Sequence, residues 1–99
     1  MRNTKNNVTL IGNMGSSAQI TNFKNGSKVA RFNLATSGRS ETEWHRVFAW
    51  GNMAHFIEKF GKKGREVAIH GRLVNRTYLN KEGKKRQVTE VEVKHIMGL

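Results

Sequence analysis

The chain has 99 residues, of which 18 are Lys or Arg and seven are Glu, so its formal net charge at pH 7 is +11. It has no cysteine, which excludes disulfides and thiolate metal ligands, and no apolar run approaches the roughly 20 residues of a membrane span. Its length predicts one domain, residues 1–99. The charge predicts a polyanionic partner, and nucleic acid fits better than a membrane because no basic amphipathic helix with a broad apolar face is present. A surface charged only for solubility is the alternative.

Strand-like patterns occupy the first third of the chain. Residues 7–13 form the first expected strand, and residues 18–23 and 28–37 flank a hairpin turn at Asn25 and Gly26. In the segment 28–37 the apolar residues recur at every second position, which predicts one buried face. These residues are Ala30, Phe32 and Leu34.

The stretch TEWHRVFAWGN, residues 42–52, reads as a strand with two contrasting faces. One face carries Trp44, Arg46, Phe48 and Trp50, and the other carries His45, Val47 and Ala49. Aliphatic side chains fill small barrels, so we expect the second face inside and the rings outside, where they can stack on bases while the arginine neutralises phosphate. The alternative buries the rings in the core.

The period then changes to that of a helix in residues 51–64. Met53, Phe56, Ile57 and Phe60 follow the i, i+3, i+4, i+7 spacing of an apolar helix stripe. We expect Asn52 to cap the start of this helix and Gly61 or Gly64 to end it.

Two more strands complete the pattern. Residues 65–78 should place Val67, Ile69, Gly71 and Leu73 inside and Arg72, Arg76 and Tyr78 outside. After a basic loop, 79–86, residues 87–97 should face Val91 and Val93 one way and Glu90, Glu92 and Lys94 the other. The whole order predicts an all-β fold with one short helix, a five-stranded OB-fold barrel with the helix between strands three and four.

Basic residues next to the expected aromatic faces suggest the edges of a groove, although each of them taken alone fits a solvated side chain better than a phosphate contact. They are Lys62, Lys63 and Arg65 after the helix, and Lys81, Lys84, Lys85 and Arg86 in the last loop. The four histidines are scattered without paired spacing, and no carboxylate pair or Ser-His-acid set converges, so we expect neither a metal site, a cofactor nor enzyme activity.

These segments resemble the bacterial single-stranded DNA-binding proteins. NNVTLIGNMG, NGSKVARFNLATS, TEWHRVFAWGNMA, KKGREVAIHGRL and VTEVEV look like the five strands of that family, TEWHRV being the most specific, and the likeness runs from about residue 6 to 93. The resemblance implies an OB fold and a cytoplasmic, nucleoid-associated homotetramer. Such a protein binds single-stranded DNA without sequence specificity and protects it in replication, recombination and repair.

The resemblance also implies roles for single residues. Stacking falls to Trp44, Trp50 and Tyr78, and backbone contacts fall to Arg46, Arg72, Arg76, Lys62 and Lys63. His45 corresponds to a histidine near a subunit contact, and the first strand, with Val8 and Leu10, would pair between subunits.

Two departures from the family pattern stand out. The loop SGRSE is short and lacks a tryptophan often found there, and the chain ends at HIMGL without the flexible linker and acidic tip that recruit replication and repair proteins. We therefore expect either a shortened form or a specialised member, with that recruitment in doubt. A primosome-type or RNA-binding OB module, or a structural oligomerisation protein whose aromatic face is a protein interface, are the alternatives.

Overall fold

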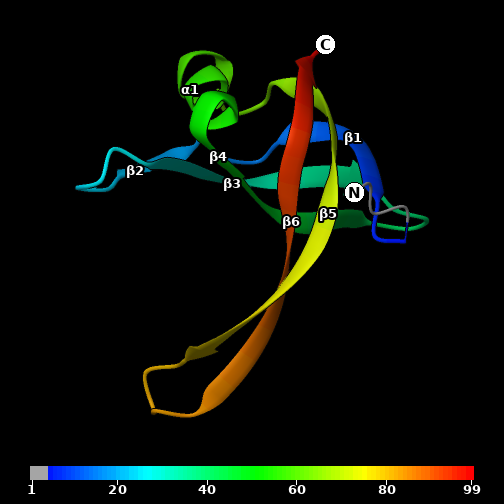
Figure 1. Ribbon diagram of the computed structural model, residues 1–99. Coiled ribbons are helices and arrows are strands. Elements are labelled where there is room, and N and C mark those ends of the chain that lie inside the picture. The colour runs from blue at the N-terminus through cyan, green and yellow to red at the C-terminus, as the bar shows by residue number, and fades with distance from the viewer. Residues whose placement is uncertain (1–4) are drawn as a thin grey trace.

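The computed structural model describes residues 5–99, which form a closed β-barrel with one helix and a projecting hairpin (Figure 1). The strands are β1 (Val8–Met14), β2 (Gln19–Asn22), β3 (Lys28–Ser37), β4 (Thr42–Trp50), β5 (Glu66–Leu79) and β6 (Lys85–Gly98), and the helix is α1 (Gly51–Phe60). The sheet order is β1-β5-β6-β4-β3-β2, and β1 also pairs with β3. This additional pairing closes a ring of five strands and leaves β2 outside it, on β3.

The predicted OB barrel is confirmed. All pairings are antiparallel except that of β4 with β6, which is parallel at Val47↔Val91 and Phe48↔Glu92. The helix follows the third strand of the ring, as predicted. It lies between β4 and β5 in the numbering of Figure 1 because the short β2 counts as a strand of its own.

The barrel interior is filled by the aliphatic faces that the alternation predicted. Val47 and Ala49 are 2% and 0% exposed, and they pack with the inward residues of the other strands. The core cluster comprises Met14, Ala30, Phe32, Leu34, Val47, Ala49, Ala54, Ile57, Val67, Ile69, Val91 and Val93. The alternative, with Trp44 and Trp50 in the core, is therefore wrong.

The helix packs on the barrel through Ala54 and Ile57. It begins two residues earlier than an Asn52 cap requires: Trp50 is the N-cap and makes no side-chain capping bond, so that prediction is wrong. The predicted end is confirmed, because the Gly61 N–H donates to the Ile57 carbonyl. Phe60 at the last turn is exposed and packs on Phe56 instead of the core.

The hairpin of β2 and β3 turns where the sequence predicted. Gly26 has φ +91°, a conformation that glycine adopts without strain, and the Asn25 side-chain oxygen accepts a bond from the Ser27 N–H at 3.0 Å.

Strands β5 and β6 continue past the barrel as a two-stranded arm (Figure 1). Their pairing runs as far as Leu79↔Lys85, so the turn is shorter than the predicted loop 79–86, and Lys85 and Arg86 belong to β6. A register shift at His70/Gly71 marks the bend. A Cβ at Gly71 would lie 2.9 Å from the Glu92 carbonyl carbon, so only glycine allows the two strands this close an approach.

Leu73 is a correction that follows from this arm. Its side chain is 47% exposed and is not part of the core, although the alternation predicted it inside. The reason is that β5 leaves the barrel here, so the inward direction no longer faces a closed interior. Within residues 5–99 no helix is long and apolar enough to cross a membrane.

Candidate nucleic-acid interface

Two exposed tryptophans stand on the outer face of β4. Trp44 is 62% exposed and Trp50 is 43% exposed, and Arg46 lies exposed between them. Six residues of strand separate the rings, which corresponds to about 20 Å. The predicted placement of these three side chains on the outside of the barrel is confirmed.

Phe48 does not share this exposure, so the prediction that all three rings face solvent is wrong. The ring is on the predicted face but is only 8% exposed. Arg31 lies opposite it on β3, and the Arg31 guanidinium carbon sits 5.3 Å from the ring centroid. Arg31 therefore covers the Phe48 ring in a cation–π contact. The ring cannot stack on a nucleobase while Arg31 stays in place.

Phe23 is an exposed ring that the sequence reasoning missed. It sits at the end of the β2–β3 hairpin, is 45% exposed, and its centroid lies 5.8 Å from that of Trp50, with 31° between the planes. The signal available in the sequence was an aromatic residue directly before a predicted hairpin turn. The turn folds it back against Trp50, so the two rings form one platform.

The arm carries the third predicted stacking residue and two predicted phosphate contacts. Tyr78 is 38% exposed, and the Arg76 guanidinium lies 5.8 Å from its ring centroid. Arg72 and Arg76 are exposed on the same face, as predicted, but both are paired with glutamates of β6. Arg72 Nε donates to Glu92 at 2.8 Å, and Arg76 donates to Glu90.

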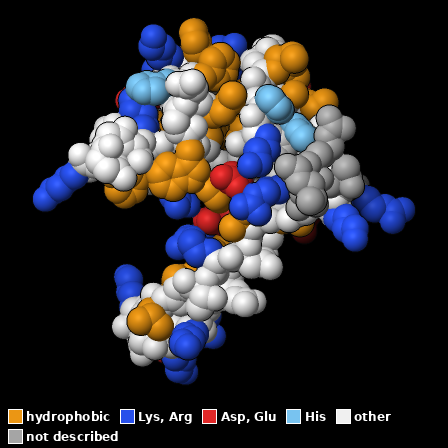
Figure 2. Space-filling model, viewed as in Figure 1, with side chains coloured by type: hydrophobic (Ala, Val, Ile, Leu, Met, Phe, Trp, Pro, Cys, Tyr) orange, Lys and Arg blue, Asp and Glu red, His pale blue; other side chains and the backbone are white. Residues whose placement is uncertain are grey.

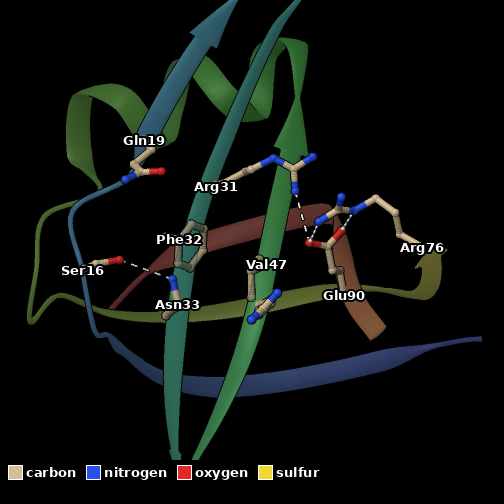
Figure 3. Close-up of a pocket in the computed structure, with 9 residues that line it drawn as sticks. Ser16, Gln19, Arg31, Phe32, Asn33, Val47, Arg76 and Glu90 are labelled. Carbon is tan, nitrogen blue, oxygen red and sulfur yellow. Dashed lines mark hydrogen bonds and ion pairs between the residues drawn. The ribbon is translucent and has the colours of Figure 1, made fainter. Parts of the chain in front are cut away.

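A groove of about 480 Å³ opens between β3, β4 and the base of the arm (Figure 3). Three arginines from three different strands, Arg31, Arg46 and Arg76, line it together with Asn33 and Glu90. In Figure 2, acidic side chains lie between apolar and basic ones where the arm meets the barrel. Sequence reasoning missed Arg31, because only the β3–β4 register brings it to this face.

Glu90 forms the floor of this groove. It is 5% exposed, accepts two bonds from Arg76 (Nε at 3.2 Å and Nη2 at 3.1 Å) and accepts one from Arg31 Nη1 at 3.2 Å. Burial by itself raises the pKa of Glu90, but the hydrogen bonds and charges of Arg76 and Arg31 outweigh burial and hold the pKa below its usual value. The bond to Glu90 raises the pKa of Arg76 in turn. The carboxylate is therefore ionised at neutral pH.

A second groove, of about 350 Å³, separates Trp44 from the arm. Arg46 and His45 line it on the β4 side, and Leu73 and Val88 line it on the arm. The exposed Leu73 thus supplies an apolar wall opposite an indole ring. The two grooves share Arg46 as a lining residue, and together they are called the track.

The predicted basic residues lie in two places outside the lining of the two grooves. Lys62 and Lys63 are exposed in the turn after α1, where the Lys63 N–H donates to Ser17 Oγ at 3.2 Å, next to the groove residue Ser16. Lys84 and Arg86 are exposed near the tip of the arm, where basic side chains cluster in Figure 2. The structure therefore brings the first pair near the groove and leaves the second pair on the arm.

Residues 5–99 match the single-strand binding protein family. The chain belongs to this family. Curated relatives are proteins called single-stranded DNA-binding protein 1 from Chlorobaculum tepidum (40% identity over 87% of this chain and 59% of that one) and from Xylella fastidiosa (35%, 95% and 76%). A single-stranded DNA-binding protein from Bacteroides thetaiotaomicron is 34% identical over 89% of this chain and 62% of its own length. The chain thus spans about three fifths of two of these relatives.

Within residues 5–99, β1 of this family member has an open edge. One edge pairs with β5 from Val8 to Asn13, whereas β3 pairs with the other only at Asn13 and Met14. Val8 and Leu10 are half-buried, and half-buried His45 places its Nε2 2.9 Å from Thr36 Oγ1. In the described part of the chain no three His or Glu side chains form a metal-binding cluster.

Proposed function

We propose that this chain binds single-stranded DNA without sequence preference, through base stacking and phosphate neutralisation. The observation that carries the proposal is the pair of exposed tryptophans on β4, Trp44 and Trp50 with Phe23 against it, on either side of Arg46, which is one of three arginines that line a groove. Rings of this kind stack on any base, and arginines contact the backbone that all sequences share. The names of the relatives support the same ligand.

The path of the strand follows from the track. Bases stack on Trp44 and on the platform of Trp50 and Phe23, about 20 Å apart along β4, while Arg46 and the groove arginines contact the phosphates between them. Tyr78, Arg72, Lys84 and Arg86 extend this surface along the arm, and Lys62 and Lys63 extend it past α1. The Phe48 ring does not contact the DNA; it packs against the Arg31 guanidinium and supports it.

The open edge of β1 supports a proposal about assembly. We place a subunit contact at Val8, Leu10 and His45, with a homotetramer as the assembled form, because an unpaired strand edge is a template for a second copy. The assembled protein would bind and protect single strands in the bacterial cytoplasm during replication, recombination and repair, without catalysis. Light scattering tests the assembly, since a monomer at all concentrations would contradict it.

The binding proposal is tested by titrating the protein with oligo-dT and following tryptophan fluorescence. We expect quenching, an affinity for single strands well above that for duplex of equal length, and a salt slope of about 0.7 per phosphate neutralised. Equal affinity for duplex would refute the proposal. Tighter binding of the matching RNA would favour an RNA-binding module, and binding that salt does not weaken would favour a protein interface.

Two variants with matched controls test the stacking. Trp44→Ala and Trp50→Ala should each weaken binding by roughly 5- to 150-fold, the equivalent of about 1–3 kcal/mol per base. Phe60→Ala is the control, since its ring is 46% exposed, packs on Phe56 and lines neither groove. Binding that stays unchanged in both tryptophan variants would remove the stacking mechanism.

A further inference from the structure

We infer that Glu90 is a positioning residue for nucleic-acid binding: it holds the guanidinium groups of Arg31 and Arg76 at the groove floor, in the orientation that contacts the DNA backbone. This inference rests on the proposed function and assigns it a residue of the charge opposite to that expected at a DNA contact. An acidic side chain repels a polyanion, so a buried glutamate within a basic groove needs an explanation of its own.

Glu90, Arg31 and Arg76 form a cluster in which each residue comes from a different strand. Arg31 comes from β3, Arg76 from the arm strand β5, and Glu90 from β6, and the two arginines reach the carboxylate from different sides (Figure 3). Glu90 is 5% exposed, whereas the arginine side chains are 42% and 45% exposed. The acid is therefore hidden below, and the two cations form the surface above it.

Both arginines keep hydrogen-bond donors that Glu90 does not use. Each guanidinium has five N–H donors, and Glu90 accepts one from Arg31 and two from Arg76. Most donors of Arg31 and several of Arg76 are left for a ligand. A free arginine side chain carries substantial rotamer entropy, and a carboxylate that fixes its planar fork removes this cost before the ligand arrives.

The ion pairs of Glu90 also connect the arm to the barrel. The arm leaves the barrel near Leu73, and Arg76 lies on the arm itself. Through Glu90 this arginine is tied to Arg31, which in turn lies over Phe48 of β4. The cluster therefore fixes the base of the arm relative to the stacking strand, so that the rings and the phosphate contacts keep one spacing.

The test uses two changes at Glu90 and one control. Glu90→Gln removes the charge, Glu90→Asp keeps the charge but shortens the reach, and Glu82→Gln removes one negative charge from the exposed tip of the arm. If Glu90 acts only through its negative charge, Glu90→Gln and Glu82→Gln should bind oligo-dT more tightly, and the affinity of Glu90→Asp should be unchanged. If Glu90 positions the arginines, both Glu90 variants should bind oligo-dT more weakly, by about tenfold for Glu90→Gln, and Glu82→Gln should not bind it more weakly.

The salt dependence separates positioning from a loss of folded protein. A variant that merely unfolds more easily lowers the bound fraction and keeps the salt slope of the folded molecules. Loss of both ordered arginines should reduce the slope by about 1.4, which is 0.7 for each phosphate contact. Glu90→Asp provides the measurement if Glu90→Gln fails to fold, and circular dichroism establishes the folded fraction of each.

The outcomes are distinct. If the Glu90 variants bind as tightly as the unchanged protein with the same slope, the positioning role is wrong and the proposed function stands. If the unchanged protein does not prefer single strands to duplex, the proposed function itself fails, whatever the variants do.

Discussion

Gly15 offers a way to move one stacking ring without removing it. A Cβ at this position would lie 2.8 Å from Cη2 of Trp44 and closer still to Cζ3, inside the 3.0 Å that real Cβ contacts respect. Gly15 is not among the glycines with positive φ, so alanine fits the backbone. The Gly15→Ala variant must therefore displace the Trp44 indole from its place against the β1–β2 connection.

The size of the effect follows from the exposure of the ring. Trp44 is 62% exposed, so the ring can swing towards solvent without disturbing the core, and we expect the free energy of unfolding to change by less than about 1 kcal/mol. Binding should suffer more, because a displaced ring loses part of a stacking contact of about 1–3 kcal/mol. We expect oligo-dT to bind roughly five- to thirtyfold more weakly.

Fluorescence reports the displacement directly. The chain has two tryptophans, so in a Trp50→Phe background the emission belongs to Trp44 alone. Gly64→Ala is the matched control: its φ is +89° and no atom lies near its Cβ position, so it should cost about 1 kcal/mol of stability and leave the emission unchanged. If Gly15→Ala keeps both the emission and the affinity of its parent, the packing of Trp44 on Gly15 is not what positions the ring.

Further predictions concern the core and pH. Phe48→Ala should lower the free energy of unfolding by about 3–5 kcal/mol in chemical denaturation, because the ring is buried; a loss of affinity with unchanged stability would show instead that it contacts the ligand. Leu73→Ala should cost less than about 1 kcal/mol, whereas Ile69→Ala, at 1% exposed, should cost about 2–5; equal costs would place Leu73 in the core. The arginines hold the pKa of Glu90 below its usual value, so its ion pairs add stability above the pKa of the unfolded state and lose it as the pH falls through the folded pKa. Denaturation at neutral pH and at about pH 3 should therefore show the advantage over Glu90→Gln shrinking in acid, and a constant difference would contradict this.

The alternation of side chains was sufficient to predict the barrel and the faces of β4. Val47 and Ala49 lie inside because their aliphatic neighbours on other strands need partners, and that requirement is visible in the sequence. The turn at Gly26 was equally visible, since a positive φ favours glycine.

Exposure was harder to predict than direction. Phe48 points outward as expected, but Arg31 covers it, and that contact depends on the register of β3 against β4, which a single sequence does not reveal. Leu73 points inward as expected, but β1 pairs with β5 only as far as Gly71, so the barrel wall is open beside it. In both cases the direction of the side chain was right and its surroundings were set by another strand.

The ion pairs of the β6 glutamates also depend on the register between strands, which the sequence does not reveal. The pattern placed Glu90 and Glu92 on one polar face and Arg72 and Arg76 on another, and only the β5–β6 register joins them into ion pairs. Burial of Glu90 depends on Arg31 as well, from a third strand. Interactions that need three strands at once are the part of the site that the sequence could not predict.

The parallel contact of β4 with β6 has a consequence for how the molecule opens. It joins positions 47 and 91, and 48 and 92, far apart along the chain, whereas β3 with β4 and β5 with β6 join through short turns. This pairing holds only two residue pairs, whereas the β3–β4 and β5–β6 pairings are long, so we expect amide hydrogen exchange along this seam to be faster than along those two pairings. Phe48 and Val91, the residue next to Glu90, lie on this seam. Glu90 lines the groove, so we expect a DNA strand in the groove to contact both β4 and β6. We expect exchange at Val47 and Val91 to slow when oligo-dT is bound.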